Sequence, residues 1–231
     1  MAIEKLFSDL IVDKKLTITD DPFLVENFID IKKYISWDVL NDAINNDFVY
    51  WEILDFNGNI IDIPFDEPYW FNGLKQQNKS FIIDHINAGY TFKITKTSIL
   101  TDNLKLLTSL VQDAFFVSAD IHIYGSKGSA KSFDPHTDMP ANFIIQVDGE
   151  TDWIIFKNKV SSLLKYNHRD DNIRHLEPML EHTIKPGDLL YIPSKYYHCA
   201  LPDAPRLSIS IPCFSDVNKL PIDTKIYNVN G

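Results

Sequence analysis

The chain has 231 residues, of which 45% are hydrophobic and 13% aromatic, enough for one substantial core and too many for a disordered protein. Its formal net charge of −10 and its lack of any basic run exclude a general nucleic-acid binder, because phosphate affinity rests on clustered Lys and Arg. No stretch approaches the roughly 20 apolar residues of a membrane span, and residues 1–15 carry charge unlike a signal peptide, so we expect a cytoplasmic protein. The acidic surface either favours a basic protein substrate or serves only solubility.

The first half of the chain mixes helical patterns with a hairpin. Ser36, followed by WDVLNDAI, predicts a helix with Ser36 as its N-cap. The runs 48–54 and 60–63, turned around Asn-Gly-Asn, predict a β-hairpin. An apolar face predicts a further helix over about 101–116, marked by Leu104, Leu107, Val111 and Phe115. We expect residues 1–117 to form an annex packed on the fold of the second half.

Strand signals become dense after residue 117. They cover 119–124, 134–139, 142–147, 152–157, 181–185, 188–192, 197–201 and 205–212. Eight short strands separated by turns indicate a jelly-roll or cupin barrel over 118–231. Asp148-Gly149 predicts that the third and fourth strands form a hairpin. Residues 158–180 are predicted to be a polar, helical insertion.

Two imidazoles and one carboxylate stand in a pattern that suits a metal ion. Side chains two apart on a strand share a face, so a strand over 134–139 would point His136 and Asp138 the same way. An apolar strand over 189–192 leads directly to His198. Two histidines and one carboxylate occupy one face of an octahedron, which leaves a non-haem Fe(II) ion free to bind a cosubstrate and O₂. The sequence therefore predicts an oxygenase with His136, Asp138 and His198 as metal ligands.

The same residues carry a family resemblance. The runs DPHTDMPANFIIQVDGETDWIIF (134–156) and LEHTIKPGDLLYIPSKYYHCA (180–200) resemble the JmjC and cupin-like branch of the 2-oxoglutarate-dependent oxygenases, especially small bacterial enzymes that hydroxylate protein side chains. The resemblance covers about residues 118–214, and its most specific part is GD-x-LY-x-P followed by His. It implies a mainly β, α+β fold built on a double-stranded β-helix. It also implies Fe(II), held at one end by His136, Asp138 and His198, and 2-oxoglutarate as cosubstrate.

The anchor for the cosubstrate departs from the family pattern. The far carboxylate of 2-oxoglutarate needs a buried cation, commonly Lys or Arg on the fourth strand, where this chain has Thr151. Alternation puts Arg206 and Ser208 on one face of their strand, and a guanidinium can bind a carboxylate through two parallel hydrogen bonds. Alternatively Arg206 points to solvent, or Lys157 carries the charge, since it shares the strand parity of Thr151. Other residues predicted to line the pocket are Tyr124, Ser132 and Asn142, whereas Trp153 is expected in the core.

Three functions stay open at this level. The first is hydroxylation of an unactivated C–H bond in a protein side chain or a modified RNA base, and the second is the same chemistry on an amino acid or natural-product intermediate. The third is a cupin-fold metal-binding protein without 2-oxoglutarate chemistry, as the threonine at 151 would allow. Tyr69, Trp70 and Phe71 within the segment 64–80 are expected either to line the entrance to the iron or to pack the annex on the barrel.

Overall fold

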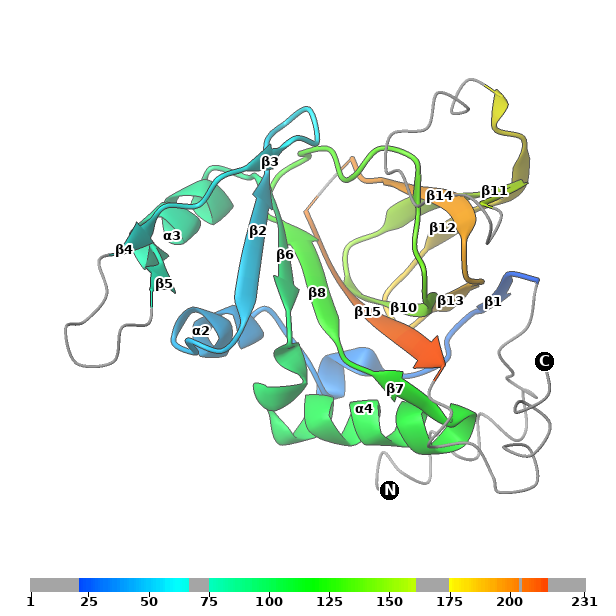
Figure 1. The fold of residues 1–231 in the computed structure, drawn as a ribbon, viewed down its shortest axis with the longest axis horizontal. Helices are drawn as coiled ribbons and strands as arrows, with labels where there is room; N and C mark the ends of the chain where they lie inside the picture. The colour runs from blue at the N-terminus through cyan, green and yellow to red at the C-terminus, as the bar shows by residue number, and fades with distance from the viewer. Residues whose placement is uncertain (1–20, 67–74, 161–174, 204, 216–231) are drawn as a thin grey trace, which may run out of the picture.

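The computed structural model describes residues 21–66, 75–160, 175–203 and 205–215, and these fold around two facing β-sheets (Figure 1). The nine-stranded major sheet contains β1 (Phe23–Val25), β2 (Tyr50–Leu54), β3 (Ile60–Ile61), β6 (Thr91–Thr95), β7 (Val117–Ala119), β8 (His122–Ser126), β10 (Ala141–Asp148), β13 (Leu189–Ile192) and β15 (Arg206–Ser215). The four-stranded minor sheet contains β9 (His136–Thr137), β11 (Thr151–Lys159), β12 (Pro178–Ile184) and β14 (Tyr196–Leu201). A third, two-stranded sheet joins β4 (Phe65–Asp66) to β5 (Gln76–Gln77).

Neighbouring strands in each sheet often come from distant parts of the sequence. In the major sheet it is β1-β13-β10-β15-β8-β6-β2-β3, with β7 also paired to β15, and in the minor sheet it is β12-β11-β14-β9. The helices are α2 (Val39–Ile44), α3 (Lys79–Asn87) and α4 (Asp102–Phe115), with 3-10 turns η1 (Ile31–Lys33) and η2 (Thr97–Ile99). None of these described helices is long and apolar enough to cross a membrane. Two antiparallel sheets facing each other agree with the predicted jelly-roll.

The two faces of the major sheet differ in chemistry. On β15, Leu207, Ile209 and Ile211 are fully buried in the main core, which also takes in residues of α2, α4 and η1. Burying such a side chain stabilises the fold by roughly 1.5–3 kcal/mol. The alternate residues of β15 point into the space between the sheets. A small apolar cluster closes part of that space and is made of Ile144, Ile155, Ile184, Leu190 and Ile192. The pocket in the rest of this space is lined by polar side chains together with Phe133, Trp153 and Ala200.

The predictions for the first half are largely confirmed. The helix expected over 101–116 is α4, and the Thr101 side chain caps it by accepting from the backbone N of Leu104. The expected hairpin is the pair β2 and β3. The N-cap at Ser36 is wrong, because α2 begins only at Val39. The Ser36 hydroxyl instead accepts from the backbone N of Asp38 within a preceding turn.

The Asp148-Gly149 hairpin is also wrong. Strand β10 pairs with β13 and β15, whereas β11 pairs with β12 and β14, so the turn carries the chain from one sheet to the other. Gly149 adopts a φ of +66°, where a Cβ would collide with the carbonyl oxygen of Pro205. At the turn, the Gln146 side chain donates hydrogen bonds to the backbone carbonyl oxygens of Asp148 and Gly149. A turn signal fixes the reversal of the chain and leaves open whether the two strands pair.

Three further expectations differ in extent. The strand expected over 134–139 is reduced to β9, and Asp138 follows it directly. The expected helical insertion at 158–180 is strand at both ends, because β11 runs to Lys159 and β12 starts at Pro178, and residues 161–174 lie outside the described residues. The aromatic run at 69–71 lies outside them too. The division at residue 117 stays a prediction, and β2 and β6 from the first half extend the major sheet.

Candidate metal centre and its pocket

Strand pairing brings the two histidines of the metal motif face to face. His136 on β9 lies directly opposite His198 on β14, and their ring centroids are 4.5 Å apart. Directly opposed residues of antiparallel strands place their Cβ atoms about 4.5–5.5 Å apart, which suits two ligands of one ion. Asp138 follows β9, with its Oδ2 3.6 Å from Nε2 of His198. Donor atoms of His136, Asp138 and His198 all lie within 4.8 Å of one another.

Both imidazoles are oriented by backbone carbonyls. Nδ1 of His136 lies 2.8 Å from the carbonyl oxygen of Asp134, and Nδ1 of His198 lies 3.0 Å from that of Tyr196. Since a carbonyl can only accept, each Nδ1 carries the proton and donates it. Each Nε2 is then the unprotonated atom, available to a metal ion in the way that ligating histidines generally are.

Asp138 is held as a carboxylate. Its Oδ2 accepts from Nδ2 of Asn142 at 2.9 Å, and Oδ1 of Asn142 in turn accepts from the hydroxyl of Ser210 at 3.3 Å. Burial alone would raise the pKa of Asp138, but His198 and His136, when they are protonated on both ring nitrogens, outweigh burial and hold this pKa well below its usual range. The group therefore presents an anionic oxygen to the two imidazoles.

A buried cation without a partner faces the same pocket. Arg206 is 2% exposed, and within the described residues neither Nη1 nor Nη2 has a hydrogen-bond partner. Burial lowers the pKa of Arg206 to about 10. Thr151 Oγ1 and Trp153 Nε1, on neighbouring β11, are also buried and unpartnered among these residues. Buried charges in proteins are almost always paired, so this cluster of unpartnered donors suits the binding of an anion.

All nine residues that the sequence predicts for the site line one pocket. They are Tyr124, Ser132, His136, Asp138, Asn142, Thr151, His198, Arg206 and Ser208. Their roles as ligands stay proposals, because the pocket shows only that they meet. The alternative in which Arg206 points to solvent is wrong, since its side chain is enclosed.

The reserve anchor Lys157 does not reach the pocket. Its side chain is 55% exposed and pairs with Glu177. The pairing of β11 with both neighbouring strands becomes irregular beyond Ile155, so Lys157 lies past the regularly paired part of the strand that holds Thr151.

Five further residues that the sequence did not assign to the site also line the pocket: Phe133, Ile144, Trp153, Ala200 and Ser210. Ser210 was recognisable in the sequence as part of the polar row with Arg206 and Ser208, although no site role was assigned to it. Trp153 shares the parity of Thr151, and its ring centroid lies 6.1 Å from that of His198. Phe133 gave no signal in the sequence.

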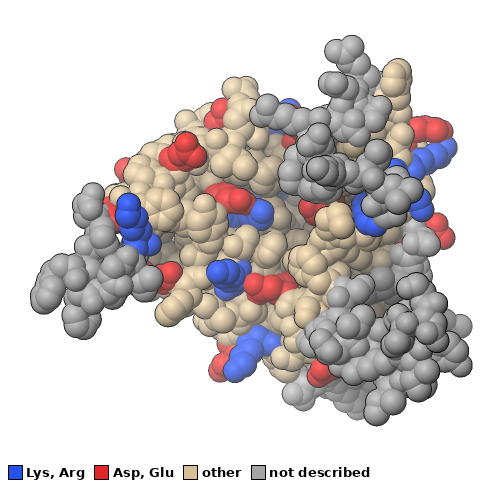
Figure 2. Space-filling view, in the orientation of Figure 1, with Lys and Arg blue, Asp and Glu red and all other residues tan. Residues whose placement is uncertain are grey.

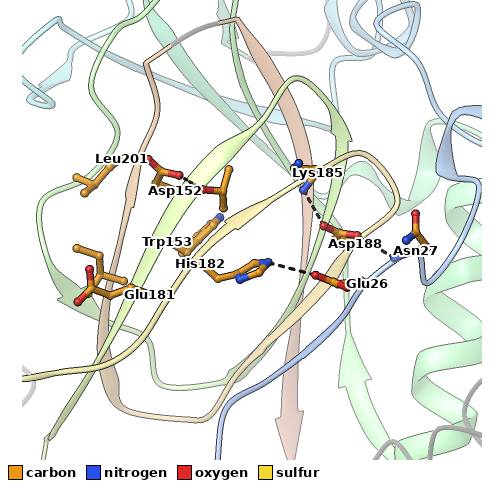
Figure 3. A pocket seen from close by; sticks show the side chains of 11 residues that line it. Glu26, Asn27, Asp152, Trp153, Glu181, His182, Lys185, Asp188 and Leu201 are labelled. Carbon is orange, nitrogen blue, oxygen red and sulfur yellow. Dashed lines mark hydrogen bonds and ion pairs between the residues drawn. The ribbon is translucent and has the colours of Figure 1, made fainter.

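A larger cleft of about 790 Å³ lies beside the minor sheet and shares Trp153 with the pocket (Figure 3). Several of its polar and charged side chains have partners within the cleft. Asp188 accepts from the backbone N atoms of Asn27 and Lys185, Asp152 accepts from Thr183, and His182 faces Glu26 at 3.9 Å. Among the described residues, the cleft holds no buried and unpartnered charge comparable to Arg206.

Comparison with known proteins gives the pocket a context. Residues 96–219 match the family described as JmjC domain. Ribosomal oxygenase 1 of Gallus gallus is 26% identical over 136 residues, covering 57% of this chain and 23% of that protein. The "bifunctional lysine-specific demethylase and histidyl-hydroxylase NO66" of Brugia malayi is 23% identical over 204 residues, covering 85% of this chain and 28% of that protein. The chain thus spans about a quarter of the length of these two curated relatives.

Solved structures show the same fold. The X-ray structure of E. coli ycfD superposes with a TM-score of 0.59 at 17% identity, covering 96% of this chain and 55% of that one. The structure of YcfD, a ribosomal oxygenase from Escherichia coli, in complex with cobalt and 2-oxoglutarate gives 0.57 at 18% identity, covering 90% and 50%. The predicted mainly β, jelly-roll fold is confirmed by these similarities.

Proposed function

The chain belongs to the JmjC domain family, and from that premise we propose that it is an Fe(II)- and 2-oxoglutarate-dependent oxygenase that hydroxylates a C–H bond of a polypeptide side chain. The observation that carries the proposal is the unpartnered guanidinium of Arg206, enclosed in the same pocket as His136, Asp138 and His198. A site that only held a metal would have no use for a second, buried and unpaired cation. A dicarboxylate that reaches from the metal to Arg206 would use both ends of the pocket.

The donor set fits ferrous iron. Two unprotonated Nε2 atoms and one ionised carboxylate oxygen are the ligands of the facial triad of non-haem iron oxygenases, and the three lie within 4.8 Å of one another. His136, Asp138 and His198 would hold the ion. When bound, Fe(II) supplies the activation of O₂ that couples decarboxylation of 2-oxoglutarate to hydroxylation of a C–H bond. Asn142 keeps the Asp138 carboxylate oriented for this role through its hydrogen bond to Oδ2.

The distal carboxylate of 2-oxoglutarate is assigned to Arg206. A guanidinium offers two parallel N–H donors to a carboxylate, and the unpartnered hydroxyl of Thr151 and indole N–H of Trp153 line the same pocket. Ser208, the next inward residue of β15, is a further hydroxyl donor. In this proposal the anchoring charge has moved from the fourth barrel strand to the last one, and Thr151 serves as a neutral partner.

The other residues that line the pocket are proposed to bind 2-oxoglutarate or to exclude water from it. Burial raises the pKa of Tyr124, so its phenol stays protonated and can donate to a bound carboxylate. Ile144, Phe133 and Ala200 supply apolar surface that keeps water from the reacting groups. Ser132, from the loop before β9, is the remaining predicted polar contact.

The names of the related proteins support a polypeptide as the substrate. Their printed names speak of ribosomal oxygenase and of histidyl hydroxylation, so a ribosomal protein side chain, with histidine as the first candidate, is the substrate that we propose. The acidic balance of the chain is compatible with such basic proteins. A cytoplasmic location and the lack of general nucleic-acid binding stay predictions from the sequence.

Uncoupled turnover tests the proposed chemistry. Purified protein loaded anaerobically with Fe(II) and given 2-oxoglutarate and O₂ should form succinate slowly without any added substrate, as measured by mass spectrometry. The His136→Ala variant provides the matched blank, because it removes a metal donor and leaves Arg206 in place. Succinate formation by wild type no faster than by this variant would refute the proposal and favour a metal-binding protein without 2-oxoglutarate chemistry.

A further inference from the structure

The polar face of the major sheet continues beyond the pocket onto β6 and β2. Ser208 of β15 is the cross-strand partner of Tyr124, Tyr124 is that of Lys93, and Lys93 is that of Glu52. Cross-strand partners share a face, so these four side chains form one row. Neighbouring strands lie about 4.8 Å apart, so the row extends roughly 15 Å from the pocket wall toward the sheet edge. Figure 2 looks onto this side of the molecule, where an acidic and a basic group lie together over β2 and β6 among uncharged surface.

The outer end of this row is a sheltered ion pair. Lys93 Nζ lies 2.7 Å from Glu52 Oε2, and the two side chains are only 21% and 25% exposed. The other lysine–carboxylate pairs within the described residues are at least 40% exposed on both sides. Pairs of that exposed kind contribute little to stability or specificity. The Lys93–Glu52 pair is the least exposed of these pairs.

A single aromatic ring connects the pair to the metal centre. Lys93 Nζ lies 5.7 Å from the ring centroid of Phe133, and that centroid lies 5.6 Å from the ring of His136. Phe133 also contacts the ring of Tyr124 at 6.4 Å. Two such contacts in succession span on the order of 10 Å, which is about three residues of extended polypeptide. A chain with one residue at the metal would therefore bring a nearby residue to Lys93.

The chemistry of the pair selects a neutral group that both accepts and donates. An ammonium has three N–H donors, so Lys93 keeps two after pairing with Glu52, and a carboxylate has several acceptor positions. A cationic group approaching here meets Lys93, and an anionic group meets Glu52, so both are disfavoured. An amide is uncharged, with a carbonyl oxygen for the lysine and an N–H for the glutamate.

We propose that Lys93, held in place by Glu52, is a specificity-determining residue that binds an amide of the polypeptide substrate, either a peptide bond or an Asn or Gln side chain. This inference rests on the proposed function and names the contact that recognises its substrate. The amide lies about three residues from the side chain that is oxidised. Lys93 differs from Arg206 in kind, because Arg206 has no anionic partner among the described residues and Lys93 already has one.

The test uses synthetic peptides that tile the ribosomal proteins as the probe, with oxidation read as a 16 Da gain by mass spectrometry and KM and kcat measured on the peptides that react. Lys93→Met should raise KM at least tenfold with kcat within about twofold, the loss expected for a charge-assisted hydrogen bond. Lys93→Arg should stay within about threefold of wild type. Lys79→Met is the matched control, because Lys79 pairs with Asp47 on an exposed surface. Succinate formation without peptide should be the same in all four proteins, and only Lys93→Met, which leaves Glu52 without its partner, should show a lower melting temperature.

Several outcomes would overturn the inference. An unchanged KM in Lys93→Met would remove the contact, and a joint fall of melting temperature, uncoupled succinate formation and kcat would make Lys93 merely structural. If Lys93→Met misfolds, the double variant Lys93→Met/Glu52→Gln replaces it, because that variant leaves no buried charge unpaired, and the same KM criterion applies. If no peptide is oxidised while wild type still forms succinate, the amide contact fails and the proposed 2-oxoglutarate chemistry stands. If wild type forms no succinate, the proposed function fails and the inference falls with it.

Discussion

Replacing Arg206 by Met should stabilise the ligand-free protein and abolish its binding of 2-oxoglutarate. Burial lowers the pKa of Arg206 to about 10, and neither Nη atom has a partner among the described residues. The drop from the ordinary guanidinium pKa corresponds to about 3 kcal/mol of lost stability. Because the folded-state pKa is the lower one, this penalty is complete at every pH below about 10 and is relieved only as the pH rises above that value. An uncharged methionine of similar length removes the penalty at pH 7.

The same substitution removes the anchor. Loss of one partner of a buried charge pair costs ~3–5 kcal/mol, so the Kd for 2-oxoglutarate should rise more than about a hundredfold. Urea unfolding of the metal-free proteins measures the first effect. Titration calorimetry with Co(II)-loaded proteins measures the second, and Co(II) affinity itself should not change. A variant less stable than wild type without ligand, or one that keeps its 2-oxoglutarate affinity, would refute the reasoning that Arg206 is a buried charge reserved for a ligand.

Three further substitutions probe the pocket and its frame. Lys157→Met should change the Kd for 2-oxoglutarate less than twofold in the same calorimetry, since this lysine is exposed and paired with Glu177, and a tenfold loss would return the anchor to it. Asn142→Leu removes the donor to Asp138 Oδ2 and should weaken Co(II) binding about 10–100-fold in competition with a chromophoric chelator, whereas unchanged binding would show that the carboxylate needs no such support. Gly149→Ala places a Cβ at φ +66° against Pro205 and should cost more than about 1 kcal/mol in urea unfolding, a value that a neutral result would contradict.

The metal ligands could be predicted from the sequence because each lies in a short, recognisable local pattern. His136 and Asp138 are two apart, and the apolar strand 189–192 with its turn points to His198. The alternation of Arg206, Ser208 and Ser210 likewise exposes a polar row in a strand that otherwise belongs to the core. The burial of Arg206 could not be predicted in the same way, because it depends on the minor sheet that lies opposite β15.

The register between strands that are distant in the sequence could not be predicted. The direct opposition of His136 and His198 depends on the pairing of β9 with β14, and nothing near either residue encodes it. The irregular pairing of β11 beyond Ile155 left no mark in the sequence, and Asp148-Gly149 gives the same turn signal whether or not its strands pair. The row from Ser208 to Glu52 joins strands from both halves of the chain and becomes visible only in the folded sheet.

A crystal structure of the protein with Co(II) and 2-oxoglutarate, collected at the cobalt absorption edge, tests the central claim most directly. The account predicts one anomalous peak bounded by His136, Asp138 and His198, with 2-oxoglutarate extending from it so that its distal carboxylate meets the guanidinium of Arg206. Cobalt bound at any other place, or a distal carboxylate held away from Arg206, would contradict it.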